Sequence, residues 1–171
     1  KSSLFRRLAS LVVEKDPNMI VAYYDLEAAR SWTADRFFLT ILKRLARASS
    51  TEVSVPDGGS AFDELNDFFE DQETRGSRFV LFLDEFDTVP SNPKFNADFF
   101  GSLRYLTSNF PIAYVTSSYE DLTDLCHGEE IRQSPFFNVF TSVDLTFMEL
   151  AEAEELVDTL CERGRIPFNP T

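Results

Sequence analysis

The most constraining feature of this sequence is a run of five consecutive apolar residues, at positions 79–83, that ends in Asp84 and Glu85. Such a run predicts a β-strand that is buried on both faces, as in a parallel sheet. Carboxylates at the end of a buried strand are costly unless hydrogen bonds or an ion stabilise them. The pair therefore predicts a functional site at the strand end. The alternative is a solvated acid pair that caps a helix or forms salt bridges.

Further apolar runs and helical periodicities surround this strand. The spacing of apolar residues predicts most of the helices, and two capping boxes, Ser60 with Asp63 and Ser118 with Asp121, predict where two of them begin. Strands are predicted at residues 19–26, 78–87 and 111–116, with the approach to another at 142–145. Helices are predicted at residues 2–15, 33–47, 96–109, 118–126 and 150–163, and from residue 60 onward.

The alternation of strands and helices predicts the α/β fold class. We expect a three-layer sandwich, with a parallel sheet, right-handed crossovers and helices on both faces. Ligands of such sheets bind outside the carboxyl ends of the strands. Asp84 and Glu85 follow one predicted strand directly, and Thr116, Ser117 and Ser118 lie at the end of the next. The polar residues therefore gather where this fold class places its sites.

Composition narrows the class of partner. The 171 residues carry 29 acidic and 16 basic side chains, a formal net charge of −13. A surface that binds phosphate backbones needs clustered Lys and Arg, so direct nucleic-acid binding is not expected. No apolar run approaches the ~18 residues that would span a bilayer, and Cys126 and Cys161 form no disulfide framework. We therefore expect a cytoplasmic protein with no membrane partner.

The residue types at the strand end fit phosphoryl chemistry. Mg²⁺ keeps several of its waters and takes few protein carboxylates, so Asp84 is the candidate to hold it. Glu85 is the candidate catalytic residue that orients and deprotonates an attacking water. Lys1 and Ser2 open a helix in the way that the last two positions of G-x-x-x-x-G-K-[ST] do, where the lysine reaches phosphates and the hydroxyl binds Mg²⁺. The alternative for Lys1 and Ser2 is a solvated tail.

Taken together, these motifs resemble the bacterial and archaeal AAA+/STAND ATPases. Lys1 and Ser2 are similar to the end of the Walker A motif, VLFLDEFD at residues 80–87 to Walker B, and PIAYVTSS at 111–118 to the sensor strand. Residues 134–140 (SPFFNVF) resemble the junction between the last strand of the core and the helical lid. The resemblance extends over the whole chain.

The resemblance implies a P-loop NTPase core in residues 1–148 and the start of a helical lid in residues 149–171. It implies ATP and Mg²⁺ as cofactors, with Lys1, Ser2, Thr116 and Ser117 at the nucleotide and with Ser2 and Asp84 at the metal. The implied activity is that of an ATP-hydrolysing switch domain in a larger multidomain protein. Effector domains and a nucleotide-dependent homo-oligomer are the implied partners.

Two departures from the family pattern keep a second reading open. The first strand and the glycine-rich loop of the family would lie before Lys1. Many relatives also carry an arginine directly after the sensor strand, where this chain has Ser117, Ser118 and Tyr119. The alternative is a catalytically weak or inactive NTPase-fold scaffold. A DNA ATPase like those of origin recognition would need a basic DNA-binding domain, which these residues do not supply.

Three other polar residues are weaker candidates. Asp25 ends a predicted strand, where it either points into the site or caps the following turn. Arg132 is a candidate arginine finger, and the alternative is a surface arginine in a loop. His127 lies beside Cys126 without further ligands at metal spacing, which favours an ordinary loop histidine.

Overall fold

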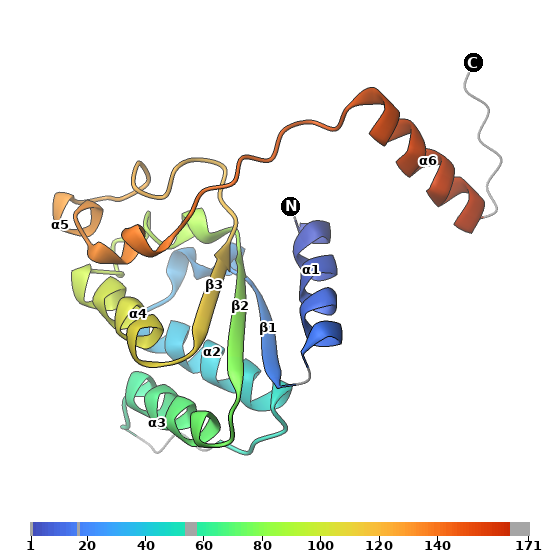
Figure 1. Cartoon of the computed structure of the whole chain (residues 1–171). Coiled ribbons are helices and arrows are strands. Elements are labelled where there is room, and N and C mark those ends of the chain that lie inside the picture. Colours follow the sequence, from blue (N-terminus) through green and yellow to red (C-terminus); the bar gives the residue numbers. More distant parts are fainter. Residues whose placement is uncertain (1, 17, 54–57, 165–171) are drawn as a thin grey trace. The chain divides into compact units, whose positions relative to one another are not determined.

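The computed structural model describes residues 2–16, 18–53 and 58–164 (Figure 1). The chain divides into two compact units, Lys1–Val139 and Phe140–Thr171. The first unit contains the sheet and the second contains the last helix. Each unit is described by itself.

The first unit is built on a parallel sheet, as predicted. Strands β1 (Met19–Asp25), β2 (Arg78–Asp84) and β3 (Ile112–Thr116) lie in the order β1-β2-β3. Asp25 pairs in register with Asp84, and Leu83 pairs with Thr116, so the three strands end at one edge of the sheet. Every residue of β2 after Arg78 is buried, which agrees with its continuous apolar sequence.

Helices cover both faces of this sheet, which confirms the layered α/β fold (Figure 1). Helix α1 (Ser2–Lys15) packs on one face, where Phe5 contacts a cluster that includes Val80 and Phe82. Helices α2 (Ala34–Ala48), α3 (Ala61–Thr74) and α4 (Ala97–Asn109) lie on the other face. Because side chains alternate along a strand, Tyr23, Phe82 and Asp84 share the face that α1 covers.

Each of the three helices on the second face begins after a capping side chain that accepts a backbone N–H. Thr33 accepts from Arg36, Ser60 accepts from Asp63 and Asn96 accepts from Phe99. Each cap satisfies one of the donors that a helix leaves unpaired in its first turn. The bond between Ser60 and Asp63 confirms the helix start predicted there. Phenylalanines fill the space below these helices, and the buried pairs Phe99–Phe100 and Phe136–Phe137 belong to the core.

The helix predicted over residues 118–126 is wrong. The chain forms turns there, because Ser118 donates to the carbonyl of Glu120 and Asp121 accepts from Thr123. Local hydrogen bonds of this kind compete with a helix when no apolar face drives its packing. The next helical segments are the short α5 (Glu129–Arg132) and the 3₁₀ turn η3 (Pro135–Val139).

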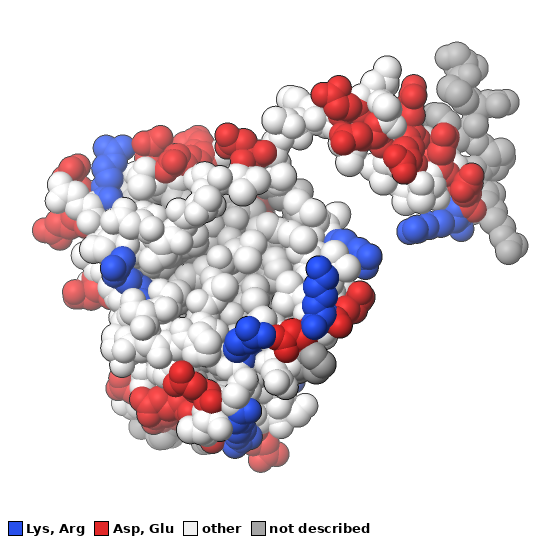
Figure 2. All heavy atoms as spheres, viewed as in Figure 1, with Lys and Arg blue, Asp and Glu red and all other residues white. Residues whose placement is uncertain are grey.

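The strand predicted at residues 142–145 is also wrong. Residues 140–149 have no regular secondary structure, and Val143 is 80% exposed and Phe147 99% exposed. An apolar alternation becomes a strand only when a neighbouring strand pairs with it. In this unit the described residues offer none. Helix α6 (Leu150–Gly164) does form, as predicted, and acidic side chains gather along it (Figure 2). No helix in the described ranges is long and apolar enough to cross a membrane.

Candidate functional site

Asp84 is the centre of the candidate site. It is the last residue of β2, its side chain lies on the face covered by α1, and the residue is only 1% exposed. Its backbone carbonyl accepts the N–H of Leu26 at 3.0 Å, which ties the end of β2 to the segment that follows β1. The central strand therefore delivers one carboxylate into a largely enclosed position.

Hydroxyl groups hold both oxygens of this carboxylate. The Ser117 Oγ donates to Asp84 Oδ1 at 2.5 Å, and the Tyr23 hydroxyl donates to Oδ2 at 2.6 Å. These distances are typical of O–H bonds to an ionised carboxylate. Burial raises the pKa of Asp84, but hydrogen bonds from Ser117, Ser2, Tyr23 and the Glu85 backbone outweigh it, so the pKa lies below its ordinary value. Asp84 is therefore ionised at neutral pH.

Glu85 turns the chain sharply just after the strand. Its backbone is left-handed, with φ 56° and ψ 40°, a conformation that non-glycine residues adopt at a cost of about 1–2 kcal/mol. Ser117 supports this turn, because its Oγ accepts the Glu85 N–H at 3.2 Å and its carbonyl accepts the Phe86 N–H at 2.9 Å. The Glu85 residue is partly exposed. Residues held in such conformations concentrate at functional sites, where the surrounding structure fixes them.

The amino end of α1 lies at the same edge of the sheet (Figure 1). Ser2, the first residue of α1, is exposed, and it lies close enough to Asp84 for its hydroxyl to help lower the pKa of that carboxylate. A helix N-terminus presents unpaired N–H groups and a partial positive charge, which favours anions such as phosphate. Lys1, the predicted phosphate ligand, lies outside the described residues.

The donors at this edge fit Mg²⁺ better than a metal that needs several protein ligands. No group of three or more His, Cys, Asp or Glu side chains within the described ranges is arranged to hold a metal ion. Mg²⁺ keeps most of its water shell and needs one or two protein oxygens. The ionised Asp84 and the hydroxyl of Ser2 supply such oxygens.

The structure brings together most, but not all, of the predicted site residues. Ser117 donates to Asp84 and accepts the Glu85 N–H, and Ser2 at the start of α1 lies close enough to help lower the pKa of Asp84. Thr116 is half-buried in β3 as the pairing partner of Leu83.

Sequence reasoning missed Tyr23, whose hydroxyl bonds Asp84 from the neighbouring strand. The alternation of side chains in residues 19–26 places Tyr23 and Tyr24 on opposite faces. Only the pairing of the two strands identifies which tyrosine reaches Asp84.

The weaker candidates lie in ordinary structural roles. The Asp25 carboxylate accepts the Glu27 N–H at 3.0 Å, so it caps the turn after β1. Arg132 pairs with Asp124 at 3.2 Å on the surface, which agrees with the surface alternative. The Nδ1 of His127 donates to the carbonyl of Pro90, which tethers its loop to the segment after β2.

Comparisons with known proteins agree with this architecture. A family model described as Novel STAND NTPase 2 matches residues 12–171. The chain is also similar to the solved structure of the ORC2 protein of Aeropyrum pernix in its ADPNP-ADP complexes, with a TM-score of 0.70 and 16% identity over 92% of this chain. The ADP form of the same protein gives a TM-score of 0.67 and 17% identity over 93% of this chain.

These structural matches cover only part of each ORC2 chain and have low sequence identity. The chain spans 40% of the length of each ORC2 chain, and at this low identity the likeness concerns the fold alone. None of the curated proteins compared with the chain matches it.

Proposed function

Since the chain belongs to the Novel STAND NTPase 2 family, we propose that it is an ATP-binding and ATP-hydrolysing switch domain that works with Mg²⁺. One observation carries this proposal: an ionised and nearly buried Asp84 that hydroxyl groups hold at the amino end of α1. A structural acid pair would need no such arrangement at a helix N-terminus. The ADPNP and ADP named for the ORC2 structures support an adenine nucleotide.

In this proposal each residue at the strand ends has a separate role. Lys1 binds the phosphates, and Ser2 and Asp84 hold the magnesium ion and its waters. Bound Mg²⁺ would neutralise charge on the phosphates. Glu85 orients the attacking water and accepts its proton, a role proposed from its position directly after Asp84 at the end of β2. Ser117 follows β3 in contact with Asp84 and would line the nucleotide site, and Thr116 is proposed there from its position at the strand end.

The larger setting is also part of the proposal. We assign residues 1–148 to the NTPase core and 149–171 to the start of a lid that reports the nucleotide state to effector domains. Loss of contacts to the γ-phosphate is the general way in which such switches change state. We propose a cytoplasmic protein that associates with itself in a nucleotide-dependent way. Nucleic acid is not proposed as a direct partner, because acidic residues outnumber basic ones by 13.

The decisive experiment uses a chain extended upstream of Lys1, where the family resemblance places the glycine-rich loop. Isothermal titration should detect MgATP binding, and phosphate release should detect turnover. Glu85→Gln should keep the binding and reduce turnover by at least about 100-fold, the usual contribution of a positioned base. The control Glu73→Gln, on the exposed surface of α3, should leave both unchanged.

Two results would contradict parts of the proposal. Turnover that is unchanged in Glu85→Gln rejects Glu85 as the catalytic residue. An extended chain that fails to bind MgATP rejects the nucleotide site altogether and leaves the scaffold alternative. Sedimentation with ADP and with a non-hydrolysable ATP analogue tests the proposed change in oligomeric state.

A further inference from the structure

We propose that Tyr23 is a positioning residue that fixes the orientation of the Asp84 carboxylate toward magnesium. For the metal, this inference rests on the proposed function. The Tyr23 hydroxyl lies 2.6 Å from Asp84 Oδ2, and 61 residues separate the two in sequence. Only the parallel pairing of β1 with β2 brings them together.

The register of the two strands explains the contact. Tyr23 pairs with Phe82, and Asp84 lies two residues further along β2 on the same face. Neighbouring strands lie about 4.8 Å apart and rise about 3.3 Å per residue, so diagonal neighbours of this kind are about 8 Å apart, which an aromatic side chain can span. The ring of Tyr23 therefore reaches forward along the sheet to the end of β2.

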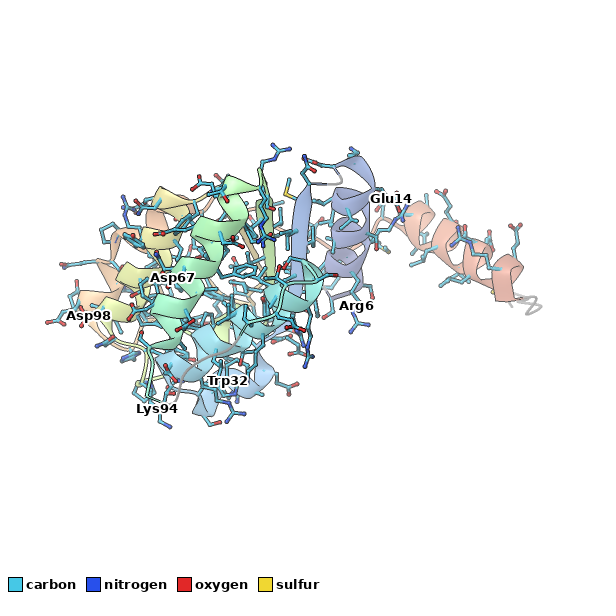
Figure 3. All side chains as sticks on the ribbon, turned by 90° about the horizontal axis from the view of Figure 1, so that it is seen from below. Arg6, Glu14, Trp32, Asp67, Lys94 and Asp98 are labelled. Atoms are coloured by element: carbon cyan, nitrogen blue, oxygen red, sulfur yellow. The ribbon has the colours of Figure 1, made fainter. Side chains whose placement is uncertain are left out.

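Helix α1 holds the Tyr23 ring from the other side. The guanidinium carbon of Arg6 lies 5.5 Å from the centre of the ring, which is a cation–π distance. Arg6 is one helical turn after Ser2, and it is labelled on α1 in Figure 3. Residues from α1, β1 and β2 thus meet at Tyr23.

The hydroxyl of Tyr23 acts here as a donor. A tyrosine hydroxyl ordinarily titrates at about pH 10, and at 2.6 Å from an ionised carboxylate it can only donate. A carboxylate has about four lone-pair sites. Tyr23 uses one on Oδ2 and Ser117 uses one on Oδ1, so a separate hydroxyl fixes each oxygen. Partners that fix a metal-binding carboxylate in this way typically change metal affinity when they are removed.

Tyr24 supplies a matched control within the same strand. The guanidinium carbon of Arg44 lies 5.2 Å from the centre of the Tyr24 ring, and the Tyr24 hydroxyl donates to the carbonyl of Ile41 at 3.0 Å. Tyr24 faces the opposite side of the sheet and does not contact Asp84. Tyr23→Phe and Tyr24→Phe each remove one hydrogen bond from a tyrosine that contacts an arginine. Only Tyr23→Phe removes a hydrogen bond to Asp84.

The test compares Tyr23→Phe with Tyr24→Phe in the chain extended upstream of Lys1. In the nucleotide-free protein, carbon-13 NMR of the carboxyl groups should give a higher pKa for Asp84 in Tyr23→Phe and an unchanged one in Tyr24→Phe. In a second arm, Tyr23→Phe should need at least about tenfold more Mg²⁺ for half-maximal stimulation of ADP binding. ADP binding without Mg²⁺ should be the same in both variants.

The two arms separate this inference from the proposed function. An Asp84 pKa that is unchanged in Tyr23→Phe, or raised equally in both variants, overturns the positioning role. An unchanged Mg²⁺ requirement overturns its link to the metal. If the extended chain binds no nucleotide, the proposed function fails, whereas a raised Asp84 pKa in Tyr23→Phe alone still supports the positioning of Asp84 by Tyr23.

Discussion

Ser117→Ala should destabilise the chain more than any other removal of a single hydroxyl near the site. The Ser117 residue is 8% exposed, and its Oγ both donates to the Asp84 carboxylate and accepts the Glu85 N–H. A hydrogen bond to a charged group contributes about 1.5–3 kcal/mol and a neutral one about 0.5–1.5 kcal/mol. We therefore expect a loss of about 2–4 kcal/mol in the free energy of unfolding at pH 7.

This loss should depend on pH. The folded pKa of Asp84 is lowered, so its ionised form stabilises the fold above the ordinary value of 3.8, and this contribution is lost as the pH falls through the folded pKa. The difference between the original chain and Ser117→Ala should therefore narrow below pH 3.8. The part due to the Glu85 N–H should remain, since that group does not titrate.

Urea denaturation followed by tryptophan fluorescence measures this effect directly. Trp32 is the single tryptophan of the chain and is 8% exposed within the first unit, so its emission reports unfolding of that unit. Ser118→Ala is the matched control, because the neighbouring hydroxyl bonds the carbonyl of Glu120 in the turn outside the site. Equal losses in the two variants, or a loss in Ser117→Ala that stays constant across the pH range, would refute the reasoning.

Three further predictions follow from single residues. Glu85→Gly should raise the free energy of unfolding by about 0.5–1 kcal/mol, because glycine adopts the left-handed conformation without strain. A lower free energy of unfolding, measured by urea denaturation, would contradict this. Asn92→Ala should lower it by about 2–4 kcal/mol, because the buried amide donates to the carbonyls of Ala29 and Trp32, and the same assay measures it. Phe99→Ala should lower the thermal midpoint, at a cost of about 3–5 kcal/mol, since the ring is 2% exposed, and calorimetry should detect it.

Much of the fold could be predicted because single segments determine it. The apolar run that ends at Asp84 needs no partner to be recognised as a buried strand, and residues 96–109 carry their helix period within themselves. The segment 142–145 shows the limit of this reasoning. Its apolar alternation matches a strand, yet the formation of a strand depends on a pairing partner elsewhere in the chain. A local pattern contains no information about that partner.

The candidate site was predictable to a similar degree. Asp84 and Glu85 could be predicted as site residues because they end a run of buried apolar residues. Ser117 was predicted at the nucleotide, whereas the structure adds its contacts with Asp84 and the Glu85 N–H. Tyr23 was missed because the adjacent Tyr24 has the same chemistry, and only the register of β1 with β2 tells them apart. Contacts between strands that are distant in sequence are therefore the part that sequence patterns leave undetermined.

The left-handed backbone at Glu85 should affect the abundance and the activity of variants at this position differently. In a library of all substitutions at this position, glycine and asparagine should give the most abundant folded protein, because both tolerate the conformation. The same two variants lack the carboxylate that turnover is proposed to need. Glycine and asparagine at position 85 should therefore score high for abundance and low for activity, a conflict that is common where activity depends on a strained residue.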